Sequence, residues 1–156
     1  MTLEIRTLTL GAVQTNAYIL ADNETGEAIV IDPVDNAPLL LRTATEAGWT
    51  IKLILATHAH FDHVLASQPL KDATGAPFWM HAEGLELLEG LPQQMQLFTG
   101  QSGIEAAQPD HFIEDEEDIW LGSIHLRALY TPGHAPGHLS FYLPEGKLVC
   151  SGDSLF

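Results

Sequence analysis

The sequence predicts a single domain of the α/β or α+β class, with sheets packed against helices. The chain has 156 residues, a length that fits one domain. Its apolar fraction of 46% is sufficient for a buried core, and strand patterns outnumber helical ones. Because no internal repeat, low-complexity tract or Gly/Ser linker divides the sequence, the expected domain spans residues 1–156.

Apolar spacing predicts the elements in order along the chain. Strands are indicated by alternation or short apolar runs, and helices by longer amphipathic segments between start and stop residues. Strands are expected at residues 3–10, 17–20, 28–31, 51–56, 77–80, 124–130, 139–143 and 148–150. Helices are expected at residues 39–47, 65–73 and 85–89.

Local residue chemistry sets the ends of these elements. Residues 23–26 have hairpin-turn chemistry, and Asp32-Pro33 ends the third strand because proline cannot donate to a ladder. Pro38 opens the first helix, where its missing N–H is harmless. The run at 51–56 is apolar apart from Lys52, which indicates a strand covered on both faces. The three helices end at glycines: Gly48, Gly75 and Gly90.

Two segments lack a regular pattern. Residues 91–109 are expected to be a long irregular segment at the mouth of a functional site. Within it, Met95, Leu97 and Phe98 either line an apolar pocket or simply pack. Residues 114–118 are consecutive acids, which we expect to form a solvated turn rather than a cation site.

Charge and cysteine content exclude several classes of function. The chain has 6 Lys+Arg against 21 Asp+Glu, a net charge of −15, so neither nucleic acid nor a membrane surface is an expected partner. No apolar run is long enough to span a bilayer, and the first residues alternate as in a strand rather than a signal peptide. Cys150 is the only cysteine, which favours the cytoplasm. A small-molecule substrate is the expected partner, and the oligomeric state stays open.

Histidines and aspartates follow three of the apolar runs. They are His58, His60, Asp62 and His63 after 51–56, His134 after 124–130, and Asp153 after 148–150. Ligands bind beyond the carboxyl ends of strands, so these strand ends are expected to build one site. Imidazoles and carboxylates are ligands for zinc, iron and manganese. His58 and His60 can point to one cation, and Asp62 and His63 to a second.

Other reactive side chains have structural interpretations. Cys150 lies within an apolar strand, where a thiol behaves as a small hydrophobic group rather than a nucleophile. His138 is expected to begin the strand at 139–143, with its ring at the edge of the site. Serine-hydrolase, P-loop and dinucleotide motifs are absent from the sequence. The remaining histidines are expected to be structural: His81, His111 and His125.

The sequence resembles the metallo-β-lactamase superfamily, and most closely its glyoxalase II (hydroxyacylglutathione hydrolase) type and short single-domain relatives. This resemblance implies an α+β fold, an αββα sandwich of two mostly antiparallel sheets with helices outside and metals at one edge. The matching elements are Ile31-Asp32-Pro33, Thr57-His58-Ala-His60-Phe-Asp62-His63, Thr131-Pro-Gly-His134-Ala-Pro-Gly-His138 and Ser151-Gly-Asp153-Ser-Leu-Phe156.

The resemblance also implies a site with two metal ions. His58, His60 and His134 would bind the first, Asp62 and His63 the second, and Asp153 would bridge them. Two Zn²⁺ ions are expected, with iron or manganese as alternatives. A metal-activated hydroxide would attack a hydroxyacylglutathione-like thioester or a related small ester, and Asp62 would accept its proton.

The last metal ligand of the family is a histidine well downstream of the bridging aspartate, whereas this sequence ends at Phe156. We therefore expect a domain truncated at its C-terminus. Two alternatives stay open. His58, His134 and Asp153 could form the two-histidine, one-carboxylate face of a mononuclear iron persulfide dioxygenase, or the chain could be a non-catalytic truncated product.

Overall fold

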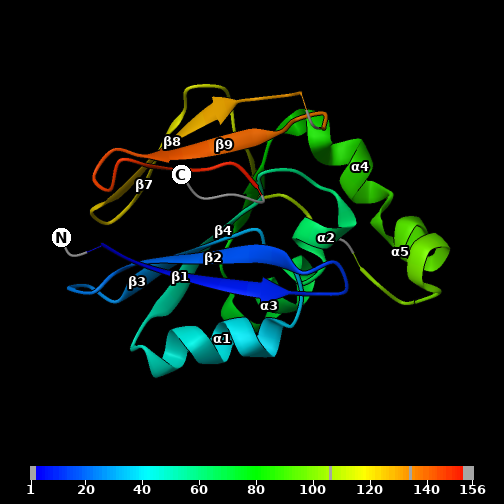
Figure 1. The fold of residues 1–156 in the computed structure, drawn as a ribbon, viewed down its shortest axis with the longest axis horizontal. Coiled ribbons are helices and arrows are strands. Elements are labelled where there is room, and N and C mark those ends of the chain that lie inside the picture. Colours follow the sequence, from blue (N-terminus) through cyan, green and yellow to red (C-terminus); the bar gives the residue numbers. More distant parts are fainter. Residues whose placement is uncertain (1–2, 106, 134, 153–156) are drawn as a thin grey trace.

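The computed structural model describes residues 3–105, 107–133 and 135–152. Two sheets pack face to face, and helices lie on the outer side of one of them (Figure 1). The strands are β1 (Leu3–Leu10), β2 (Thr15–Asp22), β3 (Glu27–Ile31), β4 (Thr50–Leu55), β5 (Phe78–Met80), β6 (His111–Phe112), β7 (Asp118–Leu121), β8 (Ile124–Tyr130), β9 (Leu139–Leu143) and β10 (Leu148–Cys150). The helices are α1 (Ala37–Glu46), α2 (Phe61–Val64), α3 (Ser67–Thr74), the 3₁₀ turn η1 (Ala82–Gly84), α4 (Leu85–Glu89) and α5 (Leu91–Thr99).

The two sheets differ in strand direction. The first sheet has the order β1-β2-β3-β4-β5-β6 and the second the order β10-β9-β8-β7. The second sheet is antiparallel throughout, as expected. The first sheet corrects the expectation of two mostly antiparallel sheets, because β3 to β6 run parallel. Helical crossovers explain this, since α1 connects β3 to β4 and α3 lies between β4 and β5, and parallel neighbours require such connections.

Two hydrophobic cores lie on opposite faces of the first sheet. One core fills the space between the sheets and includes Tyr18, Leu55 and Phe141, all fully or almost fully buried. The other lies between the first sheet and the helices and includes Leu40 and Leu70. Because β4 contributes to both cores, it is covered on both faces beyond the exposed Lys52, as its largely apolar run predicts.

Most predicted elements are confirmed. The strands β1, β8, β9 and β10 and the helix α4 have the predicted bounds, and the other predicted elements begin and end within two residues of expectation. The turn at 23–26 is closed by a hydrogen bond of 2.7 Å from the Gly26 amide to the Asp22 carbonyl oxygen.

The described residues 100–105 and 107–109 have no regular element, as expected, but two other stretches expected to be irregular are helical. Residues 91–99 form the helix α5, which buries Leu91 and Met95 one turn apart and ends at Gly100. Residues 61–64, expected in a loop, form the short helix α2, which buries Val64.

The acidic run forms the expected turn around Glu116. Its last residue, Asp118, already belongs to β7. This strand was missed because its alternation covers too few residues: Ile119 is buried between the exposed Asp118 and Trp120.

Three layers of the expected αββα sandwich are present in the described residues: a layer of helices, the first sheet and the second sheet. The helices α1 and α3 pack against one another and against β4, on the outer face of the first sheet. Figure 1 shows the second sheet packed on its other face, and α4 and α5 beside the sheets. Among the helices of the described ranges, none has the length and apolar character needed to cross a bilayer.

Truncating Phe141 to alanine should lower the free energy of unfolding by about 3–5 kcal/mol, because its fully buried ring fills the core between the sheets. Phe98→Ala is the matched control, since that ring is 65% exposed and its loss should cost less than about 1 kcal/mol. Urea unfolding of both variants measures the difference. Equal losses would show that the core between the sheets is not packed as described.

Candidate metal centre

The ends of three strands meet at one edge of the molecule. His58 follows β4, Thr131 follows β8 and Gly152 follows β10. Gly152 has a φ of +89°, and a Cβ atom built there would lie 3.4 Å from His138 Nε2 and 3.6 Å from His58 Cε1. The Leu139 amide donates a hydrogen bond of 2.7 Å to the Thr57 carbonyl oxygen, which joins the second sheet to the end of β4.

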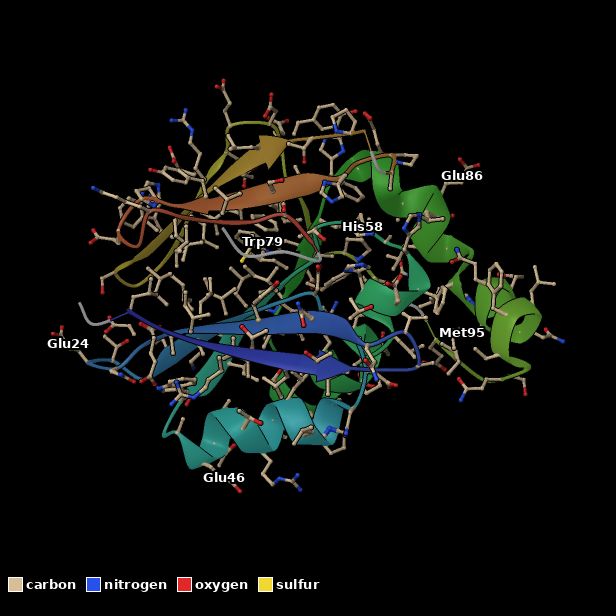
Figure 2. All side chains as sticks on the ribbon, in the orientation of Figure 1. Glu24, Glu46, His58, Trp79, Glu86 and Met95 are labelled. Atoms are coloured by element: carbon tan, nitrogen blue, oxygen red, sulfur yellow. The ribbon has the colours of Figure 1, made fainter. Side chains whose placement is uncertain are left out.

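Histidine rings converge at this edge. The ring of His58 lies 4.7 Å from that of His60, 4.0 Å from that of His63 and 4.9 Å from that of His138, measured between centroids. His58 and His63 are buried, and Figure 2 shows His58 in the region between the two sheets near α2. Asp62 joins them, with its Oδ2 atom 3.3 Å from His63 Nε2.

The carboxylate of Asp32 holds the residues of the cluster in place through hydrogen bonds. It is completely buried and accepts hydrogen bonds from the Thr57 amide at 2.7 Å, the Thr57 hydroxyl at 2.7 Å and His63 Nδ1 at 3.0 Å. Its backbone has a φ of +58°, a left-handed conformation that aspartate adopts more readily than most residues. Its own amide donates to the Leu55 carbonyl oxygen at 2.8 Å, so β3 and β4 hold it in place.

These bonds determine which nitrogen of each ring faces the site. The Thr57 hydroxyl donates its hydrogen to Asp32, so at 3.0 Å it accepts from His58 Nδ1. His63 Nδ1 likewise donates to the Asp32 carboxylate. In the neutral form of both rings, Nε2 is therefore the atom with a lone pair, and a metal ligand requires that atom.

The same contacts shift the pKa values of His63 and Asp62. Burial lowers the pKa of His63, but its hydrogen bonds to Asp32 and Asp62 and their negative charges outweigh burial and raise it to about 10. Burial raises the pKa of Asp62, but the hydrogen bond and charge of His63 and a hydrogen bond of 2.9 Å from the Thr15 hydroxyl hold it well below its usual range. Asp62 is thus ionised at neutral pH.

Other side chains named from the sequence have the expected surroundings. Burial and the charge of Asp32 raise the pKa of Cys150 to about 12, so its thiol stays protonated in the core. His138 immediately precedes β9, and its Nδ1 lies 2.8 Å from the Thr131 hydroxyl. The other histidines have structural contacts: His81 with the Glu83 amide, His111 with Glu117, and His125 with Asp118 and the Trp120 ring.

Two predicted ligands, His134 and Asp153, lie outside the described residues. Within the described ranges, no three His, Cys, Asp or Glu side chains form a group that could hold a metal ion by themselves. The structure therefore brings together His58, His60, Asp62 and His63, and leaves the complete ligand set as a prediction.

Comparison with known proteins decides the family. Residues 10–156 match the family model of the metallo-beta-lactamase superfamily. The chain belongs to the metallo-beta-lactamase superfamily.

Relatives within this superfamily carry different names. The chain is 38% identical over 156 residues to the hydroxyacylglutathione hydrolase GloC of Haemophilus influenzae, covering 99% of this chain and 73% of that protein. The crystal structure of the B3 metallo-beta-lactamase BLEG-1 superposes with a TM-score of 0.84 at 32% identity, covering 94% of this chain and 70% of that one. The structure of TTHA1623 in a di-iron-bound form has a TM-score of 0.79 at 36% identity, covering 92% and 69%.

The described side chains of this superfamily member fit a metal centre chemically. Imidazole and carboxylate are the ligands that zinc, iron and manganese accept. Two of the rings have their Nδ1 atoms engaged by a hydroxyl or a carboxylate, an arrangement that orients metal-binding histidines in proteins. The residue types of the cluster therefore suit a divalent cation.

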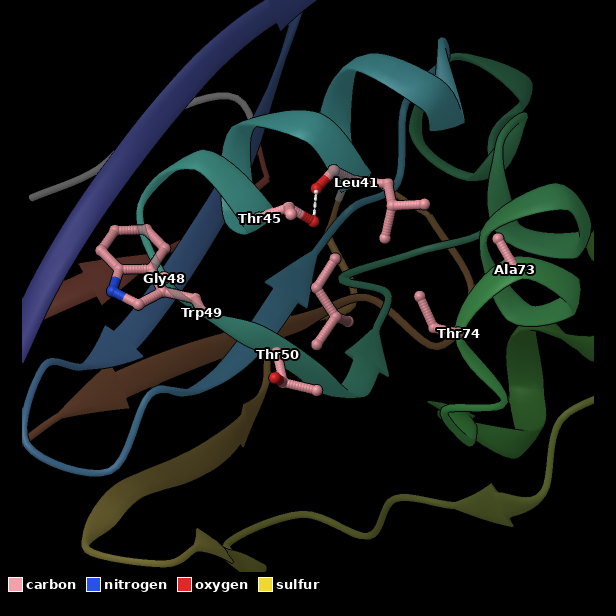
Figure 3. Close-up of a pocket in the computed structure, with 8 residues that line it drawn as sticks. Leu41, Thr45, Gly48, Trp49, Thr50, Ala73 and Thr74 are labelled. Carbon is pink, nitrogen blue, oxygen red and sulfur yellow. Dashed lines mark hydrogen bonds between the residues drawn. The ribbon is translucent and has the colours of Figure 1, made fainter.

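The structure also contains a cavity that is separate from this cluster. It has a volume of about 430 Å³ and lies between α1, β4 and α3, where Trp49 and Thr74 line it (Figure 3). Trp49 and Thr50 stand at the amino end of β4, whereas the histidines follow its carboxyl end. The length of the strand, about 20 Å, separates the cavity from the cluster.

Sequence reasoning missed the residues that support the cluster. Asp32 was noted as the end of a strand and as part of a matching element, but its contacts with Thr57 and His63 and the contact of Thr15 were not foreseen. The available signal was an acidic residue and a threonine, each at the carboxyl end of an apolar strand and each therefore at the same edge of the sheet.

The free energy of unfolding of the metal-free protein should fall as the pH rises from about 6.5 to about 10. The reason is that His63 has a raised pKa in the folded state, so its contribution is complete below its ordinary pKa of 6.5 and is lost as the folded form deprotonates. Asp32→Asn should reduce this dependence, because it removes one of the two charges facing the ring. Urea unfolding across this pH range measures it.

The matched control is Asp72→Asn, on the exposed surface of α3, where the carboxylate contacts only Gln68 in the described structure. It should leave the pH dependence of unfolding unchanged. An Asp32→Asn variant with the wild-type dependence would contradict the role given to Asp32.

Proposed function

We propose that this chain is a metal-dependent hydrolase acting on a thioester of the hydroxyacylglutathione type or on a related small ester. The observation that carries the proposal is the placement of Asp62 beside His63, whose ring lies against that of His58. Thr57 and Asp32 engage the Nδ1 atoms of these two rings and leave Nε2 for the site. The relative named hydroxyacylglutathione hydrolase supports the substrate class.

The ligand assignment follows from the motif positions. His58, His60 and His134 would hold one metal ion, and Asp62 and His63 a second. Asp153 would bridge the two. Zinc is the first choice, and the di-iron form of TTHA1623 supports iron as an alternative. When bound, such ions lower the pKa of water and polarise the carbonyl group of a substrate.

Asp62 would act as the proton acceptor. Its carboxylate is ionised at neutral pH because His63 and Thr15 stabilise the charge. The same two contacts direct its Oδ2 atom, so the group that takes the proton is held in one position. Deprotonated His63 would contribute Nε2, with its Nδ1 proton held by Asp32.

The proposed setting is the cytoplasm, with a small molecule as the partner. The net charge of −15 opposes binding to nucleic acid or anionic lipid, both of which attract basic surfaces.

Asp62→Asn should lower kcat/KM for S-lactoylglutathione or a simple acyl thioester by at least about 100-fold, because an amide cannot accept a proton. Asp72→Asn, the same change on the exposed surface of α3, is the matched control and should retain wild-type turnover. The assay follows thiol release, with the metal content of each variant measured on the same sample. Unchanged turnover in Asp62→Asn would exclude the proposed role.

A further inference from the structure

A second, smaller cavity lies directly beside the proposed proton acceptor. It has a volume of about 190 Å³ and is enclosed by the β1–β2 turn, α2 and α5. Asp62 forms part of its wall, and the preceding residue, Phe61, forms another part. A molecule in this cavity therefore contacts the same short helix that carries Asp62 and His63.

The walls of this cavity are largely apolar. Leu10, Val34, Phe61, Leu65 and Met95 come from four separate elements or turns. Burial of apolar surface favours a ligand of the same character. Met95, which is labelled in Figure 2 beside α5, is an unbranched side chain that adapts to different ligand shapes.

The acidic wall residues of this cavity disfavour anionic ligands. Its only charged wall residues are Asp35 and Asp62, both acidic, and no Lys or Arg of the described chain lines it. A carboxylate or phosphate group would meet negative charge and lose its hydration without compensation. The cavity thus favours an uncharged group.

Size limits the ligand further. An apolar cavity of about 150 Å³ in another protein accommodates benzene, so the volume here suits an aliphatic or aromatic group of roughly six carbons. The mouth is formed in part by Val13, which is 56% exposed in the β1–β2 turn. Outside the cavity lining, Phe98 of α5 stacks on Phe61 of α2 with 5.8 Å between ring centroids.

We propose that this cavity binds the acyl group of the substrate, and that this group is uncharged and apolar, of up to about six carbons. The assignment of the ligand as an acyl group rests on the proposed thioester hydrolysis. The preference for an uncharged apolar group rests on the cavity alone. An apolar acyl chain seated against Phe61 and Met95 would bring its carbonyl carbon toward Asp62.

Non-hydrolysable thioethers test the cavity without requiring catalysis. Isothermal titration of the zinc-loaded chain with S-methyl-, S-butyl- and S-hexyl-N-acetylcysteamine should show affinity rising about fourfold per methylene until the cavity is filled. S-(5-carboxypentyl)-N-acetylcysteamine should bind at least about tenfold more weakly than the hexyl compound. Equal affinities along the alkyl series would overturn the proposal.

Two lysine variants identify the place of binding. Val13→Lys puts a cation at the mouth and should improve the affinity of the carboxypentyl compound relative to the hexyl compound by about threefold. Leu97→Lys is the matched control, because Leu97 is 79% exposed on α5 and does not line the cavity, and it should leave the ratio unchanged. If the ratio of the affinities of the carboxypentyl and hexyl compounds changed equally in both variants, the alkyl group would have to bind elsewhere.

Parallel assays with the S-acetyl, S-butyryl and S-hexanoyl thioesters separate this proposal from the proposed function. Hydrolysis of all three, with no dependence of thioether binding on chain length, would keep the hydrolase and remove the acyl cavity. Length-dependent thioether binding without hydrolysis of any thioester would keep an apolar ligand site and remove the hydrolase.

Discussion

The hydrogen-bonded, buried carboxylate of Asp32 is the feature on which the histidine cluster depends. A charge with no exposure to solvent is tolerated only when donors surround it, and here the donors are Thr57 and His63. Satisfying this one group brings the end of β3, the end of β4 and α2 into contact. Thr57 in turn forms a hydrogen bond with His58 through its hydroxyl and another with the second sheet through its carbonyl oxygen. Asp32 and Thr57 therefore connect the strands of the fold to the histidine cluster.

Electrostatics make the cluster receptive to a cation. In the metal-free state the proton on His63 lies between Asp32 and Asp62, and their charges hold it there. A divalent cation requires the neutral ring and would displace this proton. Binding at His63 would replace this single positive charge with a divalent one, and the two carboxylates that stabilise the proton would also stabilise the metal.

Local sequence patterns predicted most of the fold and the histidine motif of the site, but not the contacts that support the motif. The bounds of β8, β9 and β10 follow from short, mainly apolar or alternating segments between turn residues, and the histidine motif follows a buried strand as expected. The helix α5 was missed because only Leu91 and Met95 mark its buried face. Asp32 was missed for a different reason: its partners are 25 and 31 residues away, and no local pattern shows a contact at that distance. The acyl cavity likewise depends on the docking of α5 against α2, which is a property of the tertiary structure.

The most direct test of the two-metal assignment is the metal content of the purified 156-residue chain. Plasma mass spectrometry after dialysis against zinc would measure it, with one ion expected at His58, His60 and His134 and the other at Asp62 and His63. Two ligand sets predict close to two equivalents of zinc per chain. One equivalent or less would contradict the binuclear centre, and with it the hydrolytic function assigned to this chain.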